Sequence, residues 1–121
     1  MSIANDPNSR LAITYHLTPT EVWEAQASAN AYTPEALDAD GFIHCTDGEA
    51  NLLAVANAFY QADRRPHVVL SIDVARVTAP IRYEDPARLY PHIYGPLDRD
   101  AVIAVRRVTR LADGSFAQIE E

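Results

Sequence analysis

The sequence predicts an α+β protein in which two early helices pack on a mostly antiparallel β-sheet. Two helical patterns lie in the first half of the chain, and short β-branched or aromatic runs dominate the second half. Helices and strands that segregate along the chain favour an antiparallel α+β fold over a parallel sheet. With only four glycines and no Gly-x-Gly-x-x-Gly or Gly-x-x-x-x-Gly-Lys motif, neither a Rossmann nor a P-loop phosphate site is expected.

The chain begins with a predicted strand that leads directly into a predicted helix. Residues 13–17 form an apolar run with strand character. Thr18 is a suitable N-cap, Pro19 suits the first helical position, and Glu21 completes a capping box. We expect this first helix to end near Ala29.

A second strand and helix follow an irregular stretch at residues 30–40. Residues 41–45 predict the strand, and Thr46 with Glu49 predicts a second capping box. The following helix has apolar residues at helical spacing, so one of its faces should pack on the sheet. That face consists of Leu52, Val55, Ala56 and Phe59.

The second half of the chain predicts the main part of the sheet. Residues 68–72 are densely β-branched and indicate a central strand. Asp73 is expected to cap the turn after it, and the Asp113-Gly114 pair indicates a hairpin. The other predicted strands are residues 81–84, 89–94, 101–108 and 116–119.

Composition and charge predict one cytoplasmic domain at residues 11–121, after a polar and flexible segment at residues 1–10. A single cysteine, no long apolar run and no leader pattern indicate a reducing compartment and no membrane partner. The net charge is −7 and no basic stripe is visible, so nucleic acid is not expected as a partner. The arginines can still meet a small anionic ligand locally, and the oligomeric state stays open.

Three of the four histidines, His16, His44 and His92, lie inside predicted strands. A buried histidine is costly unless its ring nitrogens find partners, and histidine is readily recruited for proton transfer or ligand binding. We therefore expect the three to build one pocket. Two alternatives are three separate structural histidines bonded to backbone, and a three-histidine zinc site. No His-x-His or His-x-x-x-His spacing supports zinc, so no metal is expected.

Polar side chains near His92 are candidates for the same pocket. Glu84 could orient a histidine or bind a ribose hydroxyl, and its alternative is a surface ion pair with Arg82. Arg88 and Tyr90 could hold an anion near His92.

Cys45 follows His44 directly, which invites comparison with a catalytic thiol. Adjacent strand residues point to opposite faces, so His44 is badly placed to activate this thiol. We therefore expect Cys45 to be a small core residue.

These residues resemble the bacterial family known as domain of unknown function 952. The matching segments are Tyr-His-Leu-Thr at 15–18 followed by Trp23, Asp-Gly-Phe-Ile-His-Cys at 40–45, Ala-Val-Ala-Asn-Ala-Phe-Tyr at 54–60, and Tyr-Pro-His-Ile-Tyr-Gly-Pro-Leu at 90–97. Many members have Ser-Thr after the cysteine where this chain has Thr46-Asp47, so the role of that serine hydroxyl would pass to Thr46.

A more distant resemblance is to the RNA 2′-phosphotransferase branch of the ADP-ribosyltransferase-like fold. It implies a split sheet with NAD, as a substrate, in a cleft between two small sheets. His16 would then contact the adenosine side of NAD and His44 would lie near the nicotinamide side, with His92 as a third polar residue. The acidic charge and the absence of an RNA-binding domain argue against tRNA phosphate removal.

From the residues and this resemblance we expect a protein that binds NAD, ADP-ribose or a related nucleotide, as a transferase or a glycohydrolase. The expected catalytic residues are His44, His92 and Glu84, and the expected ligand-binding residues are His16, Thr18, Thr46, Arg88 and Tyr94. One alternative is a non-enzymatic sensor of a small anionic metabolite. Another is an interaction domain that offers the edge strand of the Asp113-Gly114 hairpin to a partner.

Overall fold

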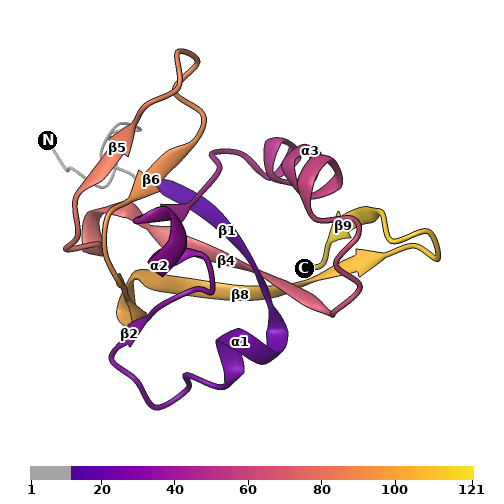
Figure 1. The fold of residues 1–121 in the computed structure, drawn as a ribbon, viewed down its shortest axis with the longest axis horizontal. Helices are drawn as coiled ribbons and strands as arrows, with labels where there is room; N and C mark the ends of the chain where they lie inside the picture. Colours follow the sequence, from indigo (N-terminus) through magenta and orange to yellow (C-terminus); the bar gives the residue numbers. More distant parts are fainter. Residues whose placement is uncertain (1–11) are drawn as a thin grey trace, which may run out of the picture.

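The computed structural model describes residues 12–121, and the segment expected to be flexible at 1–10 lies outside them. It is a mixed α+β structure with few helices and curled antiparallel sheets (Figure 1). One sheet has four strands, a second sheet has three, and two short strands form a pair. Every strand pairing in the described residues is antiparallel, which confirms the predicted sheet class.

Most predicted strands are present, and their bounds differ by a few residues. The helices are α1 (Thr20–Glu24), α2 (Leu37–Asp40) and α3 (Glu49–Phe59). The strands are β1 (Ile13–Pro19), β2 (Ala31–Tyr32), β3 (Ile43–His44), β4 (His67–Asp73), β5 (Ile81–Tyr83), β6 (Pro91–Ile93), β7 (Leu97–Asp98), β8 (Val102–Arg110) and β9 (Phe116–Ile119). The four-stranded sheet has the order β1-β4-β8-β9, the three-stranded sheet has the order β3-β6-β5, and β2 pairs with β7.

The central position predicted for residues 68–72 is confirmed. Strand β4 pairs with β1 on one side and β8 on the other, and every residue of β4 is buried. In the β1–β4 register His16 lies opposite Leu70, which places both side chains on the same face of the sheet.

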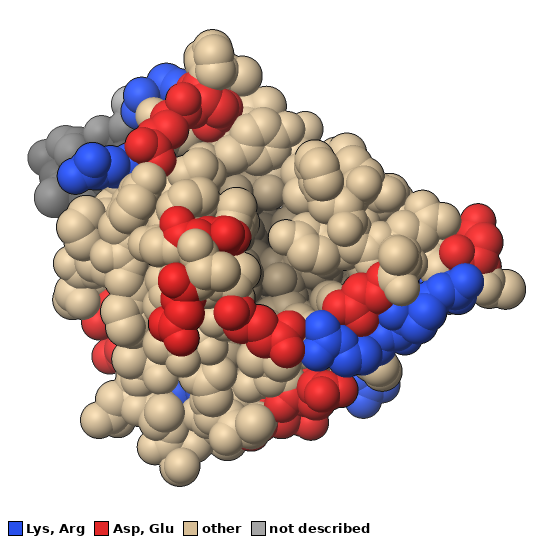
Figure 2. All heavy atoms as spheres, in the orientation of Figure 1, with Lys and Arg blue, Asp and Glu red and all other residues tan. Residues whose placement is uncertain are grey.

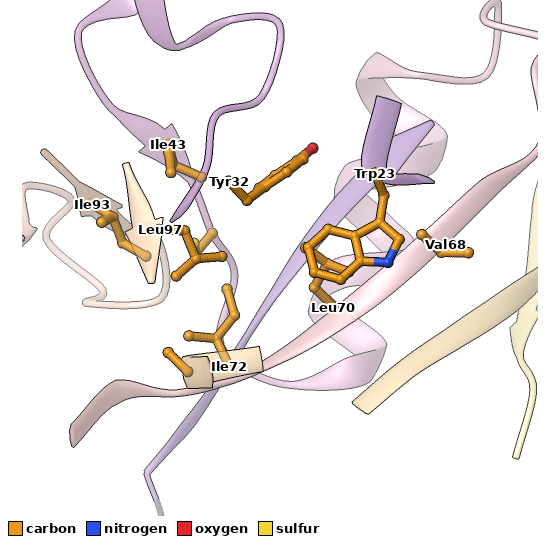
Figure 3. Packing of buried hydrophobic residues seen from close by; sticks show 10 residues of the cluster. Trp23, Tyr32, Ile43, Val68, Leu70, Ile72, Ile93 and Leu97 are labelled. Atoms are coloured by element: carbon orange, nitrogen blue, oxygen red, sulfur yellow. The ribbon is translucent and has the colours of Figure 1, made fainter. Parts of the chain in front are cut away.

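Two apolar clusters cover the two faces of this sheet. In the larger one the rings of Trp23 and Tyr32 meet edge to face with centroids 5.1 Å apart (Figure 3). Its other members include Ile43, Leu70, Ile72, Ile93 and Leu97. This cluster joins the small β3-β6-β5 sheet to β4, and each fully buried aliphatic side chain contributes roughly 2 kcal/mol. The smaller cluster, under α3, consists of Leu52, Ala56, Val69, Val108, Phe116 and Ile119.

The predicted start and length of the first helix are wrong. Helix α1 ends at Glu24 rather than near Ala29, and Pro19 at its N-cap makes no side-chain cap. Thr18 belongs to β1, faces the core and hydrogen-bonds the hydroxyl of Tyr32. This tertiary partner takes the hydroxyl that the capping box would have used. The stretch expected to be irregular, 30–40, also contains β2 and α2.

The second capping box is wrong as well. Gly48 occupies the N-cap of α3 with no side-chain cap, because Thr46 is buried and its backbone pairs with Tyr15. On the predicted apolar face Leu52 and Ala56 are buried, but Phe59 is 77% exposed. Phe59 therefore presents an aromatic ring to solvent at the end of α3.

Both predicted turns after the central strand are confirmed. The Asp73 carboxylate accepts a hydrogen bond from the Ala75 amide. At the hairpin, the Leu111 amide donates to the Ser115 carbonyl. Gly114 has φ of 93°, and a Cβ there would lie 2.7 Å from a backbone oxygen, so glycine is required.

Candidate functional site

The small sheet brings two of the three predicted histidines side by side. His44 on β3 lies directly opposite His92 on β6, and Arg82 on β5 lies opposite His92 from the other side. The two imidazole rings are 5.6 Å apart between centroids. Because residues opposite each other in an antiparallel pair share a face, these three side chains form one row across the sheet.

Each histidine of this row has a carboxylate partner. His44 Nε2 lies 2.8 Å from the Asp40 carboxylate, and His92 Nδ1 lies 3.0 Å from that of Glu84. The Tyr94 hydroxyl also donates to Glu84, and this bond together with His92 lowers the pKa of the Glu84 carboxyl. Glu84 therefore orients His92, as one reading of the sequence expected.

Phe42 holds the histidine row in place. Its ring stacks on His92 with centroids 3.9 Å apart and an interplanar angle of 18°. It also lies 4.6 Å from the His44 ring and 5.3 Å from the Tyr94 ring. Four aromatic rings thus form a platform, of which the sequence analysis named every member except Phe42.

His16 reaches this platform from the large sheet through the backbone of β3. Its Nδ1 lies 2.7 Å from the carbonyl oxygen of His44, which can only accept, so Nδ1 carries the proton. The side chain is 7% exposed, and burial lowers the pKa of His16 to about 4. The ring is therefore neutral at pH 7, and its Nε2 has a lone pair.

The Nε2 of His16 is buried and has no hydrogen-bond partner in the described structure. Such an atom in a buried position costs roughly 1–3 kcal/mol unless something pairs with it. His16 lines a crevice of about 80 Å³ together with Thr18, Pro34 and Phe42. A neutral imidazole nitrogen of this kind accepts a hydrogen bond, so only a donor can pair with it.

A second and much larger cavity opens beside the crevice. It has a volume of about 680 Å³, which lies in the range of small-molecule sites. His44 and Tyr60 line both spaces, so the crevice and the cavity meet at these two side chains. His92, Cys45 and Thr46 line the cavity but not the crevice.

The remaining predicted ligand-binding residues are spread over the site. Thr18 lines the crevice, Thr46 lines the cavity, and Tyr94 belongs to the platform. Arg88 is not among the residues that line either space, and its guanidinium lies over the Tyr83 ring at 4.8 Å. The structure thus brings together every predicted site residue except Arg88.

Cys45 is buried as expected, and burial raises the pKa of its thiol. A protonated thiol is a poor nucleophile, so the structure supports the core role predicted for it. Among residues 12–121 no three histidine, cysteine or carboxylate side chains gather closely enough to hold a metal ion.

Several residues of the site were missed by the sequence analysis. Asp40 precedes His44 by four positions, a spacing that could have suggested the pair, although no helix spans both residues. The walls of the large cavity were missed because they come from α3 and the segment before β6. These residues are Val55, Phe59, Tyr60 and Asp85.

The family model described as Protein of unknown function (DUF952) matches residues 17–105. The chain belongs to this family. The DUF952 match contains His44, His92 and both of their carboxylate partners, and it begins one residue after His16.

Solved structures confirm the fold of this DUF952 chain. The crystal structure of protein CC0527 from Caulobacter crescentus has a TM-score of 0.74 and 22% identity, covering 88% of this chain and 94% of that chain. The solution NMR structure of CC0527 has a TM-score of 0.66 and 21% identity, covering 84% of this chain and 89% of that chain. At this identity the likeness shows the fold alone. No curated protein matches the chain, and no helix within residues 12–121 has the length and apolarity to cross a membrane.

Proposed function

We propose that the protein binds NAD or a related ADP-ribose nucleotide where the crevice and the cavity meet, and that it cleaves the nicotinamide–ribose bond as a transferase or glycohydrolase. The observation that carries this proposal is the buried, unpartnered Nε2 of His16. A neutral imidazole nitrogen accepts a hydrogen bond, so its partner must be a donor. A ribose hydroxyl or an adenine amino group is such a donor, and a phosphate oxygen is not.

The site consists of two spaces that share His44 and Tyr60, which suits a ligand with two parts. One part would enter the crevice beside His16, and the other would pass His44 into the larger cavity. Arg82 lies opposite His92 in the sheet register, and its guanidinium is 5.3 Å from the Tyr94 ring centroid. Arg82 lines neither space, so it would meet a phosphate group that lies outside them, beside the Tyr94 ring.

Cleavage of the nicotinamide–ribose bond requires a group that stabilises positive charge on the ribose and a group that accepts a proton. When the nicotinamide–ribose bond breaks, its electron pair leaves with nicotinamide and the ribose gains oxocarbenium character. Carboxylates at Asp40 and Glu84 would stabilise that positive charge. The attacking water or acceptor hydroxyl would lose its proton to His44 or His92, each oriented by its carboxylate.

The resemblance to the ADP-ribosyltransferase-like fold supports the same assignment. In that resemblance His16 falls on the residue that contacts the adenosine side, and His44 falls near the nicotinamide side. Here the His16 Nδ1 donates to the carbonyl of His44, so a direct hydrogen bond joins the two positions.

Thermal unfolding with NAD, ADP-ribose, AMP and a 2′-phosphorylated nucleotide tests the binding. A ligand at 100 times its dissociation constant adds about 2.7 kcal/mol, which raises the midpoint by on the order of 10 °C in a domain of this size. We expect this rise with NAD or ADP-ribose, and its loss in His16→Ala. Thr14→Val is the matched control, because Thr14 lies on the same face of β1 and lines neither space.

Chromatography of the NAD sample then tests the reaction. Release of nicotinamide that depends on His44 supports bond cleavage. Saturable binding with no product would contradict the catalytic part of the proposal and favour the sensor alternative. A midpoint that no nucleotide raises would overturn the proposed function.

A further inference from the structure

The large cavity has aromatic rings at its mouth. Phe59 at the end of α3 is 77% exposed, and Tyr90 just before β6 is 37% exposed. Both line the cavity, together with Tyr60. Large apolar rings left exposed around a cavity are typical of a binding site rather than of an ordinary surface.

The charges at this cavity are negative. Its described lining residues include Asp40 and Asp85 and no lysine or arginine. The Asp85 carboxylate accepts hydrogen bonds from the amides of Leu89 and Tyr90, which lower its pKa and keep it ionised. Figure 2 shows the hollow on this face with acidic side chains along one side of it.

The negative charge of the cavity also affects the pKa of Tyr60. Burial raises the pKa of Tyr60, and the charge of Asp40 raises it further. A phosphate placed here would meet two carboxylates and no lysine or arginine, with the imidazoles of His44 and His92 as its nitrogen neighbours. A cation would meet two carboxylates and exposed aromatic rings, a combination that attracts cations in proteins.

We propose that the large cavity binds an organic cation, an alkylpyridinium, guanidinium or ammonium group, between the Phe59 and Tyr90 rings and the Asp40 and Asp85 carboxylates. The identity of the cation rests on the proposed function. If NAD is the ligand, its nicotinamide ring is an alkylpyridinium and is the only cationic part of the molecule. A separate guanidinium or ammonium compound, such as an acceptor, has the same charge chemistry.

Ligand pairs that differ in charge but little in shape give the direct test. Isothermal titration calorimetry on the full chain would compare N1-methylnicotinamide with neutral nicotinamide, and NAD in its oxidised form with NADH. We expect the member of each pair that carries the pyridinium charge to bind about tenfold more tightly, which corresponds to about 1.4 kcal/mol. Agmatine, a guanidinium compound, would be titrated in parallel to separate a pyridinium site from a general cation site.

Variants on one helix separate the cavity charge from the overall charge. Asp40→Asn should lower the preference for the cation several-fold, because it removes a carboxylate from the cavity wall. Asp38→Asn is the matched control, since Asp38 is exposed on the same helix and is not a lining residue. Phe59→Leu should also weaken cation binding with folding intact, because this ring is largely exposed.

The outcomes separate this inference from the proposed function. Equal binding of the charged and neutral partners, or a loss that is the same in Asp40→Asn and Asp38→Asn, would overturn the cation site even if NAD binds. Binding of N1-methylnicotinamide or agmatine by a protein that ignores NAD and ADP-ribose would support the cation site and reject the proposed function. Failure of both cations to bind would reject the cation site.

Discussion

His16 and His67 are two buried histidines on neighbouring strands, and they differ in the surroundings of the ring nitrogen Nε2. Each Nδ1 donates at 2.7 Å to a backbone carbonyl, that of His44 for His16 and that of Arg65 for His67. The Nε2 of His67 lies 3.7 Å from the Asp63 carboxylate, whereas the Nε2 of His16 has no partner. Burial lowers the pKa of both, but only His67 has a carboxylate that opposes this shift.

The comparison shows which buried histidine has a charged side chain near its second ring nitrogen. The Asp63 carboxylate, 3.7 Å from the Nε2 of His67, is a counter-ion for this ring once it takes a proton. His16 stays neutral and leaves an acceptor at the wall of a crevice. The two buried histidines thus differ in whether a carboxylate lies near the second ring nitrogen, and three predictions test this distinction.

The largest expected effect is on the pH dependence of stability. Unfolded His16 takes a proton below about pH 6.5, whereas the folded side chain takes one only below about pH 4. The unfolded state therefore binds more protons between these values, and the free energy of unfolding falls as the pH drops from 6.5 to 4. The full loss attributable to His16 is about 3 kcal/mol.

Urea unfolding at pH 7, 6, 5 and 4 measures this loss. His16→Asn should flatten the curve in this window, because the asparagine amide can still donate to the carbonyl of His44 but does not titrate. His67→Asn should flatten it less, since Asp63 partly offsets the burial of His67. Equal curves for wild type and His16→Asn would contradict the neutral state assigned to His16.

The strands were predictable from the sequence because their pattern is local. Alternation and β-branching located β4 and β8 within a few residues, with no knowledge of their partners. Both capping boxes failed for a tertiary reason. Thr18 and Thr46 lie in extended segments whose partners are Tyr32 and the backbone of Tyr15, and no local motif reports such partners.

The site was predictable in part for the same reason. The strand context of His44 and His92 identified both histidines, and the register then placed them together. The open Nε2 of His16 depends on which atoms of distant segments fill the space around it, and sequence spacing carries no such information. The exposed Phe59 was assigned to the core, because helical periodicity does not show where the sheet beneath a helix ends.

A second prediction removes the counter-ion that distinguishes His67. Asp63→Asn should lower the pKa of His67 further, toward the behaviour of His16, because the opposing carboxylate charge is lost. The pKa of His16 should not change. Stability should fall by about 1 kcal/mol or less, since Asp63 also pairs with the partly exposed Arg65 at 2.7 Å.

NMR titration of the imidazole resonances follows both histidines in one sample. Asp38→Asn, an exposed aspartate on α2, controls for the loss of one negative charge. A His67 pKa that stays constant in Asp63→Asn would show that the two histidines differ for some reason other than this carboxylate.

The smallest expected effect concerns Thr14, whose hydroxyl is also buried without a partner on the same face of β1. Unlike His16, Thr14 lines neither the crevice nor the large cavity, so no bound molecule should reach its hydroxyl. Thr14→Val keeps the shape and removes the unpaired group, which should stabilise the protein by about 0.5–1 kcal/mol. Nucleotide binding should be unchanged, whereas His16→Ala should abolish it. A Thr14→Val protein that is destabilised by 1 kcal/mol or loses nucleotide binding would mean that an unpaired buried atom on β1 does not by itself mark the ligand contact, and the distinction drawn for His16 would then fail.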